Sequence, residues 1–345
     1  MPDESIQAVL KAHPAVRADW LATYSEEVIA PELEVVDPHH HLWNHPGDRY
    51  LYDQAVEDFS SGHKVTATVH VQCRSMYREH GPEVLKPVGE TEFVRRIAAR
   101  TAQTDQPIQI CAGIVGTVDL LLGQAVQPAL EAHVEAGEGQ FRGIRPTVVW
   151  HENREILPVS APAGVLQSNQ AHAAATCIRK MGMTLDLWAF FTQLGEVAQF
   201  CEAHPDLTVI INHTGGPLGI GPYRGRRDEV FSEWRDRIQD LSELPNTVMK
   251  LGGLAMRYAG FVFNERTSPP SSDELVAAWK PYMRLCIDLF GPKRCMFESN
   301  FPVDKAMCSY RALWNAYKKM TSDLTPVERQ DLFSATAARV YRIAV

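Results

Sequence analysis

The fold is decided by the stretch Leu33-Glu34-Val35-Val36-Asp37-Pro38-His39-His40-His41-Leu42-Trp43. Its first four residues form a short apolar run, which predicts a buried strand. Side chains alternate between the two faces of a strand, so we expect Asp37, His39 and His41 on one face and His40 on the other. Two imidazoles at a strand end can bind one divalent metal ion, and a carboxylate beside them can orient a ring. The alternative is a polar strand end whose histidines only form hydrogen bonds.

The rest of the chain alternates strand-like and helix-like segments. Alternation of this kind predicts an α/β protein with a parallel sheet, and eight repeats indicate a (β/α)8 (TIM) barrel with its functional residues at the strands' carboxyl ends. An open doubly wound sheet is the alternative, but no glycine-rich phosphate motif follows the first strand. The eight strands are predicted at residues 33–36, 65–72, 108–118, 141–149, 183–187, 208–212, 247–251 and 295–298.

The domain organisation is predicted to be simple. Residues 1–33 are expected to form an N-terminal helical extension, whose apolar contacts include Trp20 and Leu21 and which ends near Pro31. Residues 34–345 are expected to form one barrel domain, since 345 residues suffice for a single large core.

Composition excludes several classes of function. A net charge of −8 argues against nucleic acid as the main partner. No uncharged apolar run approaches the roughly 18 residues that a membrane helix needs. The seven cysteines form no Cys-x-x-Cys motif, which predicts reduced thiols and a cytoplasmic protein.

The second predicted strand alternates apolar and polar side chains. Its polar residues are Thr66, Thr68, His70 and Gln72. The surrounding helices should pack against the apolar face, so we expect the polar set inside the barrel. Gln72 would then lie nearest the mouth as a substrate contact, and His70 would be a buried, hydrogen-bonded residue.

The motifs around the first and sixth strands resemble the amidohydrolase superfamily. The resemblance is to the amidohydrolase-related branch, which contains sugar lactonases, dicarboxylate lactonases and some decarboxylases. It rests on the Asp-Pro-His-His-His-Leu-Trp stretch and on His213, which ends an apolar strand and precedes a glycine-rich turn. The resemblance implies a divalent metal ion, zinc or manganese, bound by His39, His41 and His213.

Other strand ends supply candidate substrate contacts. Phe141-Arg142-Gly143-Ile144-Arg145 resembles the family's fourth strand, and the Arg145 guanidinium is suited to binding a carboxylate. Trp43 is expected to form a pocket wall. Asp186 ends the fifth strand among apolar residues, so it must be paired or bind a ligand, and structural ion pairing is as good an account as substrate binding. Lys250, in the apolar seventh strand, needs a carboxylate partner.

The eighth strand departs from the family. Relatives usually have Gly-Ser-Asp-Trp-Pro, whose Asp binds metal or activates water, whereas this chain has Glu298-Ser299-Asn300-Phe301-Pro302. Asn300 stands in the catalytic position but cannot act as a general base. We therefore expect Glu298, two residues earlier, or Asp304, in the following loop, to supply the catalytic carboxylate.

These features predict a metal-assisted hydrolase that opens a lactone of a small, anionic sugar acid or aromatic-degradation intermediate. A metal-free mechanism, in which the histidines polarise the carbonyl directly, stays open. The alternatives are a metal-dependent decarboxylase or hydratase of a carboxylated compound, and a non-catalytic binding barrel. A homodimer is also expected from the resemblance.

Overall fold

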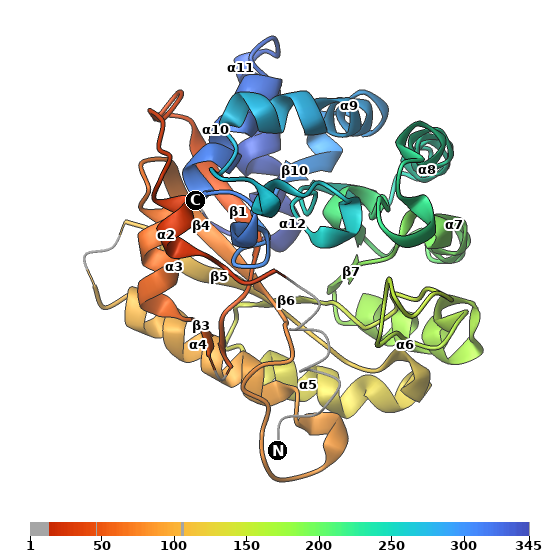
Figure 1. Cartoon of the computed structure of the whole chain (residues 1–345). Helices are drawn as coiled ribbons and strands as arrows, with labels where there is room; N and C mark the ends of the chain where they lie inside the picture. The colour runs from red at the N-terminus through yellow and green to blue at the C-terminus, as the bar shows by residue number, and fades with distance from the viewer. Residues whose placement is uncertain (1–13, 46, 105–106, 345) are drawn as a thin grey trace.

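The computed structural model describes residues 14–45, 47–104 and 107–344, and its main feature is an eight-stranded parallel sheet curled into a nearly closed barrel (Figure 1). The barrel closes where His40 bridges Phe301 and the His41 amide donates to the Phe301 carbonyl at 2.8 Å. The strands follow one another around the barrel in chain order: β1 (Glu34–His40), β4 (Lys64–Val71), β5 (Gln109–Gly116), β6 (Phe141–Ile144), β7 (Thr184–Leu187), β8 (Val209–Ile211), β9 (Thr247–Leu251) and β10 (Cys295–Phe297).

Helices surround this sheet, and a small antiparallel hairpin, β2 (Trp43–His45) with β3 (Asp48–Tyr50), follows β1. The α-helices are α2 (Ala18–Leu21), α3 (Tyr52–Phe59), α4 (Val88–Thr101), α5 (Gln127–Ala136), α6 (Asn169–Lys180), α7 (Leu194–Ala203), α8 (Arg227–Ser242), α9 (Ser272–Phe290), α10 (Tyr310–Met320), α11 (Pro326–Gln330) and α12 (Thr336–Tyr341). A π-helical segment, η11 (Asp331–Ala335), joins the last two. Short 3-10 turns are η1 (Glu83–Leu85), η2 (Leu120–Val126), η3 (Val165–Gln167), η4 (Phe191–Gln193), η5 (His213–Gly215), η6 (Gly221–Tyr223), η7 (Arg257–Ala259), η8 (Phe263–Glu265), η9 (Pro292–Arg294) and η10 (Asp304–Ala306).

The predicted barrel and its eight strands are confirmed, with shorter ends at several strands. Local chemistry explains the helix starts: Ser271 and Glu274 form a reciprocal capping box at the start of α9. Helix α5 begins only at Gln127, because Gly123 has a φ of +59° and interrupts the preceding η2. In residues 14–33 the one helix is α2, and the rest of the predicted helical extension, residues 1–13, lies outside the described residues.

The barrel interior is filled by small aliphatic side chains, which corrects the predicted orientation of β4. Ala67, Val69 and Val71 pack in one buried cluster with interior residues from other strands. Thr68 and His70 point outward instead, where His70 Nε2 lies 3.3 Å from a carboxylate oxygen of Glu90 on α4. The prediction was wrong because the helix layer supplies hydrogen-bond partners for polar side chains.

The C-terminal helix α12 closes the end of the barrel opposite the predicted site. The Tyr341 side chain is fully buried in the interior cluster. Its hydroxyl donates to Asp186 at 2.8 Å, so this helix reaches a carboxylate on β7. The chain's last helix is therefore part of the barrel's polar interior.

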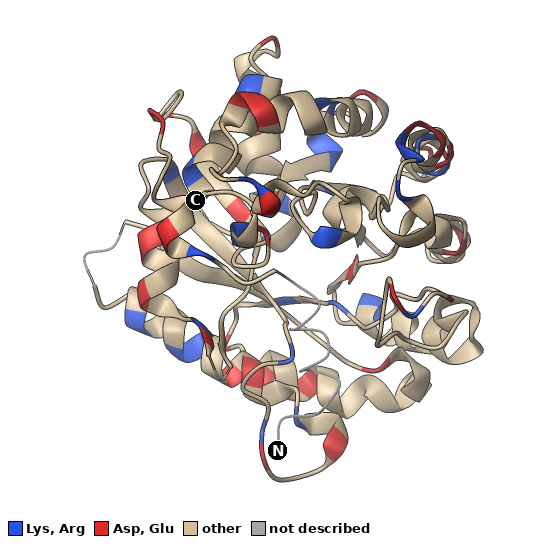
Figure 2. Cartoon of the chain, in the orientation of Figure 1, with Lys and Arg blue, Asp and Glu red and all other residues tan. Residues whose placement is uncertain are grey.

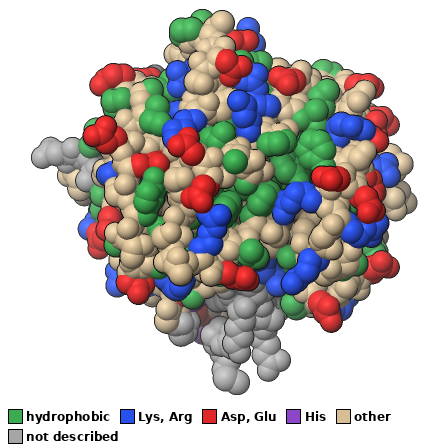
Figure 3. All heavy atoms as spheres, turned by 45° about the horizontal axis from the view of Figure 1, so that its top comes forward, with side chains coloured by type: hydrophobic (Ala, Val, Ile, Leu, Met, Phe, Trp, Pro, Cys, Tyr) green, Lys and Arg blue, Asp and Glu red, His purple; other side chains and the backbone are tan. Residues whose placement is uncertain are grey.

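The outer surface carries mixed charge. Acidic and basic residues are interspersed along the outer helices (Figure 2), and the face in Figure 3 has no continuous basic area among its described residues. All seven cysteines are unpaired, as the sequence predicts. None of the helices formed by the described residues combines the length and apolar character of a membrane span.

Candidate active site

A β-bulge in β1 sets the directions of the histidines. Asp37 pairs with Thr68 and His40 pairs with His70, so three steps along β1 correspond to two along β4. The extra residue reverses the alternation between these points. The prediction that Asp37 and His39 share a face is therefore wrong.

Asp37 ties β1 to its neighbours and takes no part in the histidine cluster. Its carboxylate accepts hydrogen bonds from the Ser299 amide at 3.0 Å and from the Tyr310 hydroxyl at 3.1 Å. Burial raises the pKa of Asp37 to about 6. The residue thus fixes the strand that carries the histidines.

Three buried side chains from different strand ends meet beneath the barrel mouth. Glu298 Oε1 lies 2.7 Å from His213 Nδ1, and Glu298 Oε2 lies 2.7 Å from His39 Nδ1. The donor atoms of the three side chains are all within 4.8 Å of one another. Glu298 Oε2 has no hydrogen-bond donor despite this contact. An unsatisfied, buried carboxylate oxygen facing imidazole nitrogens is a fit for a divalent cation.

Electrostatics keep the carboxylate ionised and the rings neutral. Burial acts to raise the pKa of Glu298, but the contact with His213 outweighs it and holds this pKa below its usual range. Burial, reinforced by Lys250, holds the pKa of His39 well below its usual range. Neutral imidazole and ionised carboxylate are the forms that bind metal ions.

The backbone leaves room for His213 only because glycine stands opposite. His213 and Thr214 both have positive φ, +56° and +54°, in the sharp turn after β8. A Cβ added at Gly253 would lie 2.5 Å from the Cβ of His213, and Gly253 itself has a φ of +68°. Any side chain at position 253 would displace the histidine.

A buried ion pair supports the cluster from below. Lys250 Nζ donates to Asp186 Oδ2 at 2.8 Å and lies 3.3 Å from His39 Nδ1. The same oxygen accepts from Tyr341 and from Asn212, at 2.8 and 3.1 Å. Asp186 does not border the pocket, so this geometry favours the structural account of Asp186 over its predicted contact with substrate.

Arg145 is a half-buried cation at the pocket floor. Its guanidinium lies 3.3 Å from His39 Nε2 and donates to the Gln72 carbonyl, while the Gln72 amide donates back to the Arg145 carbonyl at 3.1 Å. Among the described residues, no carboxylate lies within 4.0 Å of this guanidinium. Burial lowers its pKa, yet arginine stays charged in proteins. A half-buried cation without a carboxylate partner favours an anionic ligand.

His41 belongs to a separate chain of hydrogen bonds. Its Nδ1 donates to the Val71 carbonyl at 2.7 Å, and its Nε2 lies 3.2 Å from Asn300 Oδ1. Asn300 Nδ2 in turn donates to Asp304 Oδ1 at 2.7 Å. Burial, reinforced by Glu298, raises the pKa of Asp304 well above its usual range. The sequence predicted His39, His41 and His213 as metal ligands. The structure instead brings His39 and His213 together with Glu298, and His41 lies apart.

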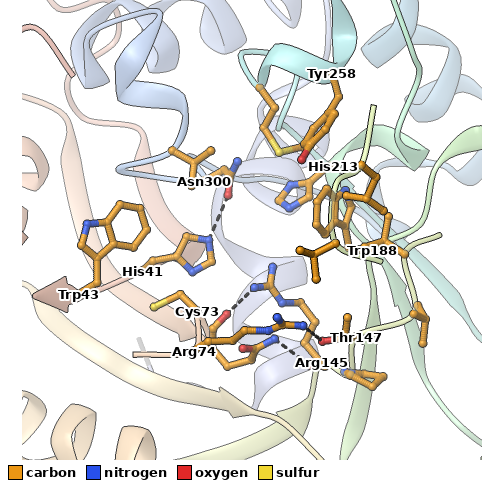
Figure 4. A pocket seen from close by; sticks show the side chains of 18 of the residues that line it. His41, Trp43, Cys73, Arg74, Arg145, Thr147, Trp188, His213, Tyr258 and Asn300 are labelled. Atoms are coloured by element: carbon orange, nitrogen blue, oxygen red, sulfur yellow. Dashed lines mark hydrogen bonds between the residues drawn. The ribbon is translucent and has the colours of Figure 1, made fainter. Parts of the chain in front are cut away.

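The pocket above these groups opens at the carboxyl ends of the strands (Figure 4). Of the residues predicted from the sequence, Trp43, Gln72, Arg145, His41, His213 and Asn300 border it. Glu298, Asp304 and His39 lie behind its wall and are fully buried, so neither predicted carboxylate reaches the pocket directly. Its complete lining is His41, Trp43, His45, Gln72, Cys73, Arg74, Arg145, Pro146, Thr147, Val148, Val149, Leu157, Val159, Trp188, His213, Met256, Tyr258, Asn300 and Val303.

Sequence reasoning missed most of the apolar wall. Trp188 directly follows the strand residue Leu187, and Tyr258 lies in the loop after β9, so position after a barrel strand was the available signal. Val149 and Leu157 carry no such signal because they come from an irregular segment after β6.

A second group of potential metal ligands lies beside the pocket. His70, Cys73 and Glu90 have donor atoms within 4.8 Å of one another. Here Glu90 Oε1 accepts from the Cys73 amide at 2.8 Å and from its thiol at 3.2 Å. Burial, reinforced by Glu90, raises the pKa of Cys73 well above its usual range, so the thiol stays protonated and serves as a donor.

Comparison with known proteins agrees with this geometry. The sequence model of the amidohydrolase family matches residues 36–343, nearly the whole chain. The chain belongs to this amidohydrolase family. The family assignment supports a hydrolase and fits the barrel with a histidine-rich mouth.

Individual relatives are distant. The chain is 28% identical over 330 residues to a protein named y4mH from Sinorhizobium fredii, covering 90% of this chain and 99% of that one. It is 24% identical over 322 residues to an L-fucono-1,5-lactonase from Burkholderia multivorans, covering 89% and 96%. A crystal structure of an amidohydrolase from Burkholderia multivorans with bound zinc superimposes with a TM-score of 0.67 at 23% identity, covering 90% and 99%. At this identity the structural likeness concerns the fold.

Proposed function

We propose that this amidohydrolase is a metal-assisted hydrolase that opens a lactone of a small anionic compound. One observation carries the proposal. A buried carboxylate with an unsatisfied oxygen, Glu298, converges with His39 and His213 directly beside Arg145, a half-buried cation that borders the pocket. The proposal assigns the ester group to the cluster and the substrate's anionic group to the arginine.

The residues that would hold the metal ion are His39, His213 and Glu298, in place of the set predicted from the sequence. Zinc or manganese bound there would polarise the ester carbonyl or lower the pKa of water to about 7. Lys250 is close to His39 but already donates to Asp186 at 2.8 Å, which leaves the unsatisfied Glu298 oxygen without a donor from the protein.

The protein's own groups bind and orient the substrate. Arg145 offers a fixed fork of donors to a carboxylate, and the Gln72 backbone holds that fork in place. His41 Nε2 and Asn300 Oδ1 lie 3.2 Å apart at the pocket edge, where both can accept a hydrogen bond from the substrate. Trp43 and the other apolar walls keep bulk water away, which strengthens these interactions.

A metal-free hydrolase on the same residues is the second candidate, favoured by the contact between His213 Nδ1 and Glu298 at 2.7 Å. An ionised carboxylate there fixes the proton on Nδ1 and leaves Nε2 as the proton acceptor of a ring that borders the pocket. In this mechanism His213 takes the proton of the attacking water. Glu298 orients and stabilises the charged ring.

The decarboxylase alternative has less support. It needs an acid that protonates carbon, and burial raises the pKa of Asp304, but this carboxyl lies behind Asn300 and outside the pocket. The non-catalytic alternative predicts that Glu298→Gln still binds ligand and that neither this variant nor the wild-type protein has activity.

Elemental analysis and turnover of six-membered lactones test the proposal together. We expect about one equivalent of zinc or manganese in wild type and in the control Glu243→Gln, whose side chain is exposed, and loss of both metal and activity in Glu298→Gln. Activity without metal would favour the second candidate. Absence of turnover on all lactones would refute the lactonase proposal.

A further inference from the structure

We infer, on the basis of the proposed function, that the substrate is a single-ring compound with an apolar body and one anionic or carbonyl group, and that polyhydroxylated sugar lactones are poor ligands. The inference rests on how polar and apolar groups are distributed around the pocket. Aliphatic and aromatic side chains form much of its wall, although Arg74, Thr147, His45 and Tyr258 also border it (Figure 4).

The walls are built from aliphatic and aromatic side chains. Val149, Leu157 and Met256 have exposed fractions of 4%, 3% and 6%, and Trp43 and Trp188 stand on opposite sides of the pocket in Figure 4. A sugar hydroxyl placed against such walls would lose its water and gain no hydrogen bond. A hydrocarbon surface at the same place gains from leaving water.

The polar atoms near the walls are already used or covered. Asn300 donates to Asp304, and the Gln72 amide donates to the Arg145 carbonyl. The indole N–H groups of the two pocket tryptophans and the amide oxygen of Gln72 have no partner, but each lies beneath the accessible surface. Arg74 is likewise engaged, because its guanidinium donates to the Thr147 hydroxyl at 2.8 Å. Few polar groups of the lining are therefore left for the three or four hydroxyls of a sugar lactone.

Size agrees with this chemistry. The cavity measures about 170 Å³. An apolar cavity of about 150 Å³ takes one benzene molecule. One six-membered ring with a carboxylate directed at Arg145 fits the space and leaves the ring against the walls.

The first test compares two carboxylates with the same ring, cyclohexanecarboxylate and its polyhydroxylated analogue quinate, by calorimetry on the wild-type protein. We expect cyclohexanecarboxylate to bind at least tenfold more tightly. Equal affinities, tighter binding of quinate, or binding of neither ligand would overturn the inference.

Matched variants locate the effect at the wall. Val149→Thr replaces a methyl group by a hydroxyl of similar size, and Val134→Thr makes the same change at a valine that is 43% exposed on α5. We expect the affinity ratio of cyclohexanecarboxylate to quinate to fall about threefold in Val149→Thr and to stay unchanged in Val134→Thr. Met256→Gln repeats the test at another wall position if the first variant unfolds. An unchanged preference in the folded wall variants would overturn the inference.

Turnover separates this inference from the proposed function. If the enzyme hydrolyses glucono-1,5-lactone faster than an alkyl-substituted six-membered lactone, the substrate class is overturned and the lactonase proposal stands. If cyclohexanecarboxylate keeps its tenfold preference but neither lactone is hydrolysed, the substrate class stands and the lactonase proposal fails.

Discussion

Lys250→Met should destabilise the protein strongly, because it removes one partner of a buried ion pair. Lys250 and Asp186 are both fully buried, with 2.8 Å between Nζ and Oδ2. In the variant, Asp186 keeps hydrogen bonds from Tyr341 and Asn212 but has lost its cation. Leaving a buried charge without its partner costs about 3–5 kcal/mol.

The corresponding shift in melting temperature follows from chain length. An unfolding entropy of about 2.1 cal/mol/K per residue gives roughly 0.7 kcal/mol/K for this chain of 345 residues. A loss of about 4 kcal/mol should then lower Tm by about 5–6 °C. Thermal and urea unfolding, followed by circular dichroism, measure the change, and Lys280→Met, at an exposed position, should stay within about 0.5 kcal/mol of wild type.

A double variant tests the cause. Adding Asp186→Asn to Lys250→Met removes both charges. The double variant should therefore lose at least about 2 kcal/mol less free energy of unfolding than the sum of the losses in the two single variants. A Lys250→Met protein as stable as wild type, or a double variant whose cost is additive, would refute the account of this ion pair.

Three further changes test the site and its surroundings. Arg145→Gln should lower kcat/KM for an anionic lactone by about 10–100-fold, from a lost charged hydrogen bond, but for a neutral lactone by less than threefold; equal losses would contradict carboxylate binding. Burial lowers the pKa of His133 to about 4, so the folded state takes up fewer protons than the unfolded state between pH 6.5 and 4. The free energy of unfolding therefore decreases as the pH is lowered through this range. Urea unfolding should show that the free energy of unfolding drops between pH 7 and pH 5 by about 2 kcal/mol less in His133→Gln than in wild type. The Asn300 amide donates to Asp304 at 2.7 Å, so Asn300→Asp places two carboxyl groups together and should lower the free energy of unfolding by about 2 kcal/mol at pH 8. The double change Asn300→Asp with Asp304→Asn should restore the melting temperature. A double variant no more stable than the single variant would contradict this account.

The sequence was sufficient for the barrel because its signals are local. Apolar runs separated by amphipathic segments predict each strand and helix on their own, and the order of the strands follows from chirality and short connections. Arg145 and His213 could be placed at the pocket because each comes directly after a predicted strand, and carboxyl ends of barrel strands meet at one mouth.

Other features depend on partners that are distant in sequence. The bulge beside His39 appears only in the pairing of β1 with β4, and it decides which side chains point inward. Glu298 reads as a catalytic base along the strand, yet His39 and His213 cover it and keep it out of the pocket. Alternation alone could not show that the polar face of β4 turns toward Glu90 on α4.

The closure of the barrel also has a consequence for synthesis on the ribosome. β1 completes its pairing through Phe301, and the carboxylate of Asp186 receives its bond from Tyr341, some 155 positions later in the chain. A nascent chain that ends before these residues exposes the free edge of β1, and open strand edges pair with other chains. With synthesis at about 5–20 residues per second, that edge is exposed for many seconds. The final fold is therefore reached only after translation is nearly complete, and the emerging chain is a natural client for chaperones.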